Sequence, residues 1–369
     1  MIDIIRLWKH VLPRKRKNAL FLIFLMLLTS FTEIVSIGAV IPFLGVLASP
    51  ETIFNEPSIS SLINYFNFKE PSDLVIPFTV AFCISVVVAA SMRLLLLYAS
   101  IQLAFAIGKD LSVSIFNKTI YQNYSVHISR NSSEVINSII SKLHAVIFNI
   151  IQPLILMIGN VLILSVVIAL LLYIDPLVAI TAFVGFGLSY LSIAAFNKRK
   201  LNLNSVKIAD NSTRQLKILQ ESLGSIRDVL IDGNQDIYTE TYRKIDSELR
   251  SSQADNIILS SSPRYVMEAI GMLLIAILAL VIILNSGEII TAIPVLGALA
   301  LGSQRLLPIL QQLYSGWSGI KGCHASLKDV LSFLEQQYPQ HYYENSKSIS
   351  ATKSLSNEMT LSFSNNISL

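Results

Sequence analysis

The chain has 369 residues, of which 53% are hydrophobic and only 14% are charged, and its mean hydropathy is +0.59. A soluble domain of this size needs more charge to cover its surface, so the composition excludes a soluble protein and indicates a polytopic membrane protein. The net charge of +4 is too small to indicate nucleic-acid binding. Cys83 and Cys323 are far apart, and the five histidines are scattered, so neither a disulfide framework nor a metal site is predicted.

A basic segment opens the chain. Residues 1–18 contain six Lys or Arg, and an apolar run follows from residue 19 to about residue 48. This run is too long for the apolar core of a signal peptide, and further apolar segments follow it. We therefore expect a cytoplasmic N-terminal segment and an uncleaved first span.

Six apolar stretches each reach the length of about 20 residues that a helix needs to cross a bilayer. They cover residues 19–48, 74–107, 143–172, 176–197, 256–285 and 289–320. The expected fold is therefore an all-α membrane protein with six transmembrane helices.

Basic residues lie almost entirely on one side of these spans. The connections at 49–73, 173–176 and 285–288 contain a single basic residue, whereas 109–142 contains four and 198–250 contains ten. Because cytoplasmic loops carry the excess of Lys and Arg, both termini and the two long loops are predicted to be cytoplasmic.

The two long loops, at about 108–142 and 198–255, are predicted to be helical hairpins. In the second loop, apolar residues recur at spacings of three and four, as in an amphipathic helix; they are Leu216, Leu219, Leu223, Ile226 and Leu230. Gly224-Ser225 is a candidate break near the tip, and Asp232-Gly233-Asn234 is typical of a turn. A disordered linker is the alternative, but it would be more polar and less periodic.

Charged residues within the apolar spans are the candidate functional residues. They are Glu33, Arg93, Arg264, Glu268 and Arg305. The helical rise places all of them about 22–31 Å below the outer boundary, in the inner half of the bilayer. Charges at this depth normally face the bundle interior or a water-filled cavity.

Three interpretations of these charges remain open. The arginines could snorkel to the inner headgroups, or Glu33 and Glu268 could neutralise two of them as structural pairs. The third interpretation is an anion site, because arginine suits bidentate capture of phosphate oxygens. Three arginines against two glutamates leave an excess of positive charge, which a dimer would double around its axis.

The predicted architecture resembles the membrane half of an ABC exporter. Three segments narrow the resemblance to the lipid-linked oligosaccharide flippases, which are ABC half-transporters that act as homodimers. These segments are SFTEIVSIGAVIPFLGVL in the first span, SSPRYVMEAIG at the start of the fifth and LGSQRLLPILQQLYSG in the sixth. The resemblance covers about residues 1–335.

The resemblance implies roles for the membrane charges. In such flippases, arginines that face the cavity hold the lipid pyrophosphate and the sugar headgroup, and Arg93, Arg264 and Arg305 match these positions. Glu268 would hold Arg264, or balance its charge while no substrate is bound. An anionic, lipid-linked substrate follows from the same resemblance.

The resemblance also implies contacts with an ATPase. The loop regions 122–134 and 220–231 would contain the coupling helices that dock on a nucleotide-binding domain. The candidate contact residues are Tyr124, His127, Glu221, Ile226 and Arg227. An exposed helix face with no partner is the alternative for any one of them.

An ATPase site cannot be recognised in the sequence. No Walker-type G-x-x-x-x-G-K-[ST] motif and no Leu-Ser-Gly-Gly-Gln signature is present. After the six-span domain at 19–335, residues 336–369 read as a polar linker followed by MTLSF at 359–363, which alternates like a strand. This segment resembles the start of a nucleotide-binding domain, so either the chain is truncated or a separate subunit supplies hydrolysis. ATP and Mg²⁺ are expected on that domain.

The predicted function is thus that of the transmembrane subunit of an ATP-driven exporter or flippase in the inner membrane. An ABC exporter of a peptide, a drug or another lipid is the main alternative. A polytopic membrane enzyme is a remote one, based on the spacing of His324 and Asp329. A scaffold or sensor outside the ABC class would leave the long hairpins unexplained.

Overall fold

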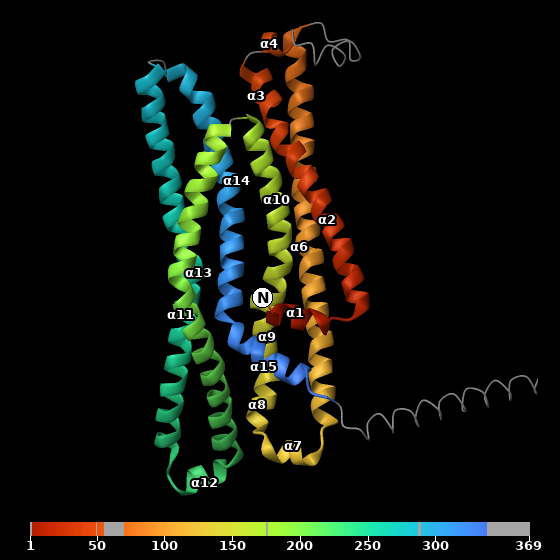
Figure 1. Cartoon of the computed structure of the whole chain (residues 1–369), viewed down its shortest axis with the longest axis vertical. Helices are drawn as coiled ribbons and strands as arrows, with labels where there is room; N and C mark the ends of the chain where they lie inside the picture. Colours follow the sequence, from red (N-terminus) through yellow and green to blue (C-terminus); the bar gives the residue numbers. More distant parts are fainter. Residues whose placement is uncertain (1, 49, 55–69, 175, 287–288, 338–369) are drawn as a thin grey trace, which may run out of the picture.

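The computed structural model of the chain describes residues 2–48, 50–54, 70–174, 176–286 and 289–337. These residues are almost entirely helical and form no strand, which confirms the all-α prediction. Long helices run side by side along the long axis, with short helices at both ends (Figure 1). In chain order the elements are α1 (Ile2–Lys9), α2 (Pro13–Gly38), α3 (Val40–Ala48), α4 (Pro50–Phe54), the 3₁₀ helix η1 (Pro71–Leu74), α6 (Val75–Ile120), α7 (Tyr124–Ser129), α8 (Ser132–Asn137), the π-helix η2 (Ser138–Lys142), α9 (Leu143–Val146), the π-helix η3 (Ile147–Ile151), α10 (Gln152–Ile174), α11 (Pro176–Gly224), α12 (Ile226–Ile231), α13 (Gln235–Ser286), α14 (Ile289–Gly322) and α15 (His324–Leu334).

Within the described residues, three helical stretches are long and apolar enough to cross a membrane. They are Pro13–Ser36, Pro71–Ile120 and Ser132–Ala169. Large apolar side chains such as Phe21, Phe24 and Leu94 are exposed on them. Such side chains are stable only against lipid or another protein surface. The other three predicted spans lie in α11, α13 and α14, so the helix arrangement agrees with six spans.

The first predicted span is not one helix. It divides into α2 and α3 at Gly38 and Ala39. Proline at position 42 explains the break, because it has no N–H to donate to the Gly38 carbonyl and its ring crowds that carbonyl. Regular hydrogen bonding resumes at Phe43, whose N–H donates to the Ala39 carbonyl at 3.2 Å. The span predicted at 19–48 thus contains a break after Gly38.

The second long loop, at about 198–255, is a helical hairpin, as predicted. Helix α11 has 49 residues and ends at Gly224, and the short helix α12 follows Ser225. The chain reverses at Gly233, whose φ of +67° is in the left-handed region that favours glycine, and α13 begins at Gln235. Helices α7 and α12 lie at the same end of the molecule (Figure 1). The tips of the two hairpins, formed by α7 and α12, therefore lie at one end of the molecule.

The largest buried cluster joins α1, α2, α6, α9, η3, α10 and α15. Within it α6 and η3 approach closely: a Cβ added to Gly108 would lie 2.2 Å from Cδ1 of Ile147. Only glycine leaves room for this approach without displacing Ile147. Helices from the two ends of the sequence thus share one core.

Buried polar side chains connect the hairpin segments with each other and with α15. The Asn137 amide donates to Thr213 Oγ1 at 3.1 Å, and the Ser212 hydroxyl donates to Asn137 Oδ1 at 3.1 Å. These bonds fix α8 against α11. Lys142, which is buried, contacts Asp329 at 2.5 Å and so fixes η2 against α15. The predicted strand, and the predicted linker apart from residues 336 and 337, lie outside the described residues, as does most of the loop at 49–73.

Candidate functional site

A proline within α13 leaves a backbone carbonyl beside the site without its usual hydrogen bond. Pro263 is buried and has no N–H, so the carbonyl of Leu259, four residues earlier, lacks its usual partner in the helix. Tyr314 of α14 supplies the missing donor: its hydroxyl donates to the Leu259 carbonyl at 3.1 Å and accepts from the Asn197 amide at 2.9 Å. This chain of bonds ties α11, α13 and α14 together beside Arg264.

A cavity of about 440 Å³ lies between these three helices. Its described lining residues are Tyr190 from α11, Arg264 and Glu268 from α13, and Leu307, Pro308, Gln311 and Gln312 from α14. We name it the arginine cavity. It combines a cation, an anion, a phenol and two amides next to apolar walls, which is the composition expected of a site for an amphiphile.

Arg264 forms no ion pair with a carboxylate among the residues that the structure describes. Glu268 lies one turn further along α13, but an arginine that precedes its glutamate is the less favourable order for a pair within a helix. Both side chains are exposed to the cavity or its mouth. The guanidinium of Arg264 is therefore available to a ligand.

Tyr190 contributes a second polar group to the cavity wall. The residue is buried, yet its hydroxyl has no hydrogen-bond partner within the described part of the chain. Buried polar atoms normally have a partner, so an orphan hydroxyl that lines a cavity indicates a missing ligand or water. Its neighbour Tyr314, whose ring centroid is 5.7 Å away, is fully hydrogen-bonded. The two phenols thus have different roles.

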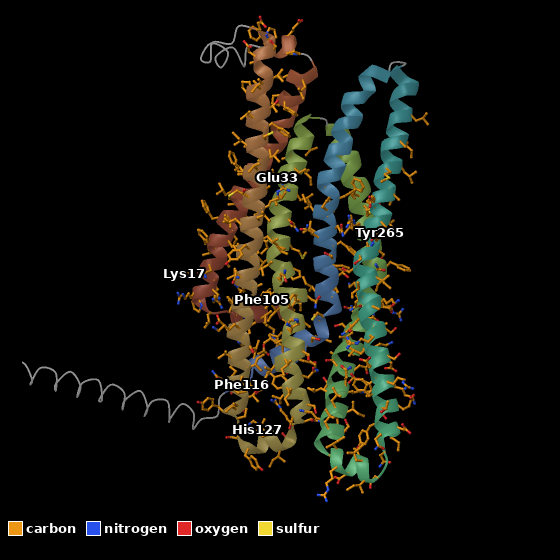
Figure 2. All side chains as sticks on the ribbon, turned by 180° about the vertical axis from the view of Figure 1, so that it is seen from behind. Lys17, Glu33, Phe105, Phe116, His127 and Tyr265 are labelled. Atoms are coloured by element: carbon orange, nitrogen blue, oxygen red, sulfur yellow. The ribbon has the colours of Figure 1, made fainter. Side chains whose placement is uncertain are left out.

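The second pair of membrane charges lies elsewhere in the chain. Arg93 Nε on α6 is 3.3 Å from Glu33 Oε2 on α2, and the Glu33 side chain is only 6% exposed against 45% for Arg93. Figure 2 places Glu33 and Tyr265, the neighbour of Arg264, on opposite sides of the bundle. Within the described residues of one chain, Arg93 does not line the arginine cavity. Arg93 and Glu33 therefore have the geometry of a structural ion pair in which only the Arg93 side chain is exposed.

Arg305 is placed only in part. It lies on α14, but its side chain is outside the part of the chain that the structure describes. We expected three arginines to converge. Of these, Arg264 lines the arginine cavity, whereas Arg93 lies away from it and pairs with Glu33.

The predicted coupling residues gather at one end of the molecule. Tyr124 and His127 are exposed on α7, and Ile226 and Arg227 are exposed on α12. Glu221 lies near the end of α11, where its carboxylate is 3.7 Å from Lys217. Exposed apolar side chains such as Tyr124 at the tip of a hairpin are typical of a surface that a partner covers.

The geometry opposes an active site made of His324 and Asp329. His324 Nε2 is 3.0 Å from Asp3, and Asp329 pairs with Lys142 instead. The described residues contain no group of three or more potential metal ligands.

Partial burial opposes ionisation of Asp3, but the hydrogen bond from Arg6 and the charge of His324 outweigh it and hold the pKa of Asp3 below its usual value.

Four further side chains at this site were not predicted from the sequence: Tyr190, Gln311, Gln312 and Tyr314. A signal for one of them exists, because Pro263 within a long helix predicts an orphan carbonyl at Leu259 that some neighbouring donor must satisfy. The sequence does not indicate which of the tyrosines that donor is.

Long apolar helices, and between them a cavity whose described lining includes a guanidinium without a described ion pair, are typical of a polytopic membrane transporter. Residues 18–293 match the family described as ABC transporter transmembrane region, and the chain belongs to this family. Its fold is similar to that of a solved protein described as "Structure of a bacterial Atm1-family ABC exporter with ATP bound". The TM-score is 0.65 at 14% identity, over 87% of this chain and 54% of the other. The chain thus has the fold of an ABC exporter transmembrane domain and spans about half the length of that protein.

Proposed function

We propose that the chain is the transmembrane subunit of an ATP-driven exporter or flippase for an anionic amphiphile. The substrate class is a lipid-linked oligosaccharide that carries a pyrophosphate, and the membrane is the inner membrane, with both termini cytoplasmic. One observation carries this proposal: Arg264 lines the arginine cavity without a described ion-pair partner, next to the orphan hydroxyl of Tyr190.

The chemistry of the arginine cavity matches a pyrophosphate. A guanidinium offers paired N–H donors to two phosphate oxygens, and a phenol offers one more donor. Glu268 partly balances the charge of Arg264 while the cavity is empty, which lowers the cost of an arginine at this depth. The amides of Gln311 and Gln312 add neutral donors at the wall formed by α14.

Transport requires parts beyond this chain. We propose that two copies act as a homodimer of half-transporters, each with a nucleotide-binding domain that is fused or separate and that binds ATP and Mg²⁺. The neighbouring helices α7 and α12, with exposed Tyr124 and Arg227, support docking of that domain at this end. Movement of the docked domain would reach the arginine cavity through the rigid helices α11 and α13.

The test uses the transporter assembled with its nucleotide-binding domain in proteoliposomes. ATP turnover is measured against added undecaprenyl pyrophosphate carrying a neutral oligosaccharide. Arg264→Ala should raise the concentration needed for half-maximal stimulation about tenfold or more, because a hydrogen-bonded charge contributes roughly 1.5–3 kcal/mol. Arg93→Ala and Arg305→Ala in the same assay show whether those arginines also contact the substrate.

Arg243→Ala is the matched control, since Arg243 lies on the same helix but is exposed in the cytoplasmic hairpin and pairs with Glu240 at 2.8 Å. This variant should leave the stimulation unchanged. An unaltered response in Arg264→Ala would refute the anion site. Stimulation by a cationic drug or a neutral peptide, and not by the pyrophosphate lipid, would place the chain among the other exporters.

A further inference from the structure

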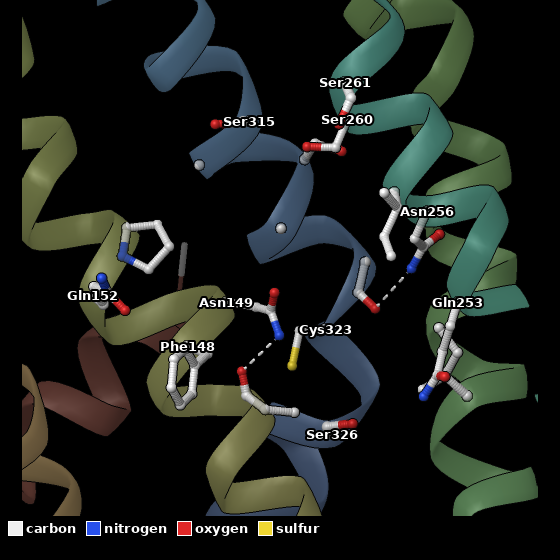
Figure 3. A pocket seen from close by; sticks show the side chains of 18 of the residues that line it. Phe148, Asn149, Gln152, Gln253, Asn256, Ser260, Ser261, Ser315, Cys323 and Ser326 are labelled. Carbon is white, nitrogen blue, oxygen red and sulfur yellow. Dashed lines mark hydrogen bonds between the residues drawn. The ribbon is translucent and has the colours of Figure 1, made fainter. Parts of the chain in front are cut away.

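A second cavity lies next to the arginine cavity on its cytoplasmic side. It has a volume of about 640 Å³ and is bounded by η3 and α10, by α13 and by α14 (Figure 3). Its lining contains five amide side chains and five serines, and no described lining residue is charged. We name it the amide–serine cavity. A volume of this size is within the range of about 300–1,000 Å³ typical of small-ligand sites.

The lining excludes most ligand classes. It offers no charge to bind a phosphate or an ammonium group, and an acyl chain would leave many polar atoms without partners at a cost for each. Amides and hydroxyls donate and accept hydrogen bonds, as the hydroxyls of a sugar do. Leu156, Ile208 and Ile257 add apolar surface, as does the ring of Phe148 at one edge (Figure 3). This chemistry fits a neutral, hydroxyl-rich group.

One buried hydroxyl at the cavity wall lacks a described hydrogen-bond partner. Ser318 is 1% exposed, yet its hydroxyl has no hydrogen-bond partner among the described residues. A buried hydroxyl without a partner at a cavity wall is uncommon and points to an absent partner. By contrast, the Asn149 and Asn256 amides donate to the carbonyls of Ala145 and Gly322 at 3.0 Å and 3.5 Å, which fixes these two side chains at the wall.

The backbone beside the cavity is irregular. Pro153 has no N–H, so the carbonyl of Asn149 has no donor four residues further along, and the π-helix η3 ends just before α10 at this point. Gly319 of α14 faces this carbonyl: a Cβ at that position would lie 3.2 Å from the Asn149 oxygen. Single π-turns within helices are frequent at functional sites.

The two cavities are neighbours, because Gln312 lines both. We propose that the amide–serine cavity binds a neutral glycan of the same amphiphile whose anionic group binds at Arg264. This inference rests on the proposed function and adds a subsite to it. One lipid would then place its phosphates beside α13 and its sugar hydroxyls between η3, α13 and α14.

The test compares two lipids that differ only in the glycan. The full chain in nanodiscs is titrated with undecaprenyl pyrophosphate, and with the same lipid carrying a neutral oligosaccharide of N-acetylhexosamines, by native mass spectrometry. The glycosylated lipid should bind about tenfold more tightly or better, as expected for a few added hydrogen bonds. Gln152→Leu and Ser318→Ala should reduce this ratio severalfold each and leave the affinity for the bare lipid unchanged. Gln102→Leu, on an exposed position of α6, is the control and should leave the ratio unchanged.

Accessibility provides a second measurement that does not depend on affinity. In a chain without its native cysteines, Ser261→Cys at the cavity wall should react with an aqueous maleimide, and only the glycosylated lipid should protect it. Equal protection by both lipids, or a ratio unaffected by the two variants, would overturn the glycan subsite alone. Binding of neither lipid to the native chain would overturn the proposed function together with it.

Discussion

The bond between Tyr314 and Leu259 allows a sharp test of how the site is held. Tyr314→Phe removes one oxygen and leaves two buried groups without a partner: the Leu259 carbonyl and the Asn197 amide. The Leu259 carbonyl cannot recover a bond within α13, because Pro263, four residues further along, has no N–H to donate.

The expected cost follows from these two groups. A buried polar atom left unsatisfied costs about 1–3 kcal/mol. The Asn197 side chain can rotate toward another acceptor, whereas the Leu259 carbonyl is fixed, so we expect a total of about 2 kcal/mol. At about 2–4 °C per kcal/mol for a large domain, the melting temperature should fall by about 5 °C.

The assay is thermal unfolding in detergent, with Tyr190→Phe as the matched control. The Tyr190 hydroxyl has no partner among the described residues, so its removal should leave the melting temperature unchanged or slightly higher. Pro263→Ala restores an N–H at position 263, so Tyr314→Phe should cost less in that background. Equal destabilisation by the two tyrosine variants, or strict additivity with Pro263→Ala, would refute the reasoning.

Three further predictions concern other parts of the chain. Arg93→Ala should lower the melting temperature more than Glu33→Gln, because the former removes the cation beside a buried carboxylate whereas the latter removes the buried charge itself; equal effects would contradict this. Gly108→Ala should destabilise by about 1–3 kcal/mol through overpacking against Ile147, and Ile147→Val should partly rescue it in the same melting assay. Burial raises the pKa of the Cys323 thiol from 9.0 to about 12, so maleimide at pH 8 should label it only after denaturation. The folded thiol keeps its proton between these values while the unfolded thiol loses it, so stability should fall as pH rises above 9.

The helical class and the hairpins could be predicted from the sequence because both depend on local patterns. Apolar runs long enough for a bilayer, and leucines at spacings of three and four up to Gly224, indicate helices wherever the rest of the chain lies. The turn at Gly233 follows from its neighbours in the same way. The break after Gly38 was also readable, since Pro42 lies four residues further on, but hydropathy alone does not reveal it.

The site depends on contacts between distant segments, so only its charged residues could be recognised. Depth along a helix places Arg93 and Arg264 at similar levels, but it does not give the direction in which each side chain points. Packing decides this: α2 brings Glu33 to Arg93, whereas α11 and α14 surround Arg264 with Tyr190 and glutamines. Neutral residues such as Tyr190 carry no hydropathy signal that separates a ligand contact from ordinary core packing.

The central claim is that Arg264 holds the anionic group of the substrate within the arginine cavity. An electron cryomicroscopy structure of the assembled transporter in nanodiscs with undecaprenyl pyrophosphate oligosaccharide tests it most directly. The account predicts phosphate density within about 4 Å of the Arg264 guanidinium and within hydrogen-bond distance of the Tyr190 hydroxyl. Phosphate density at another site, with Arg264 turned toward the acyl chains or paired with Glu268, would contradict it.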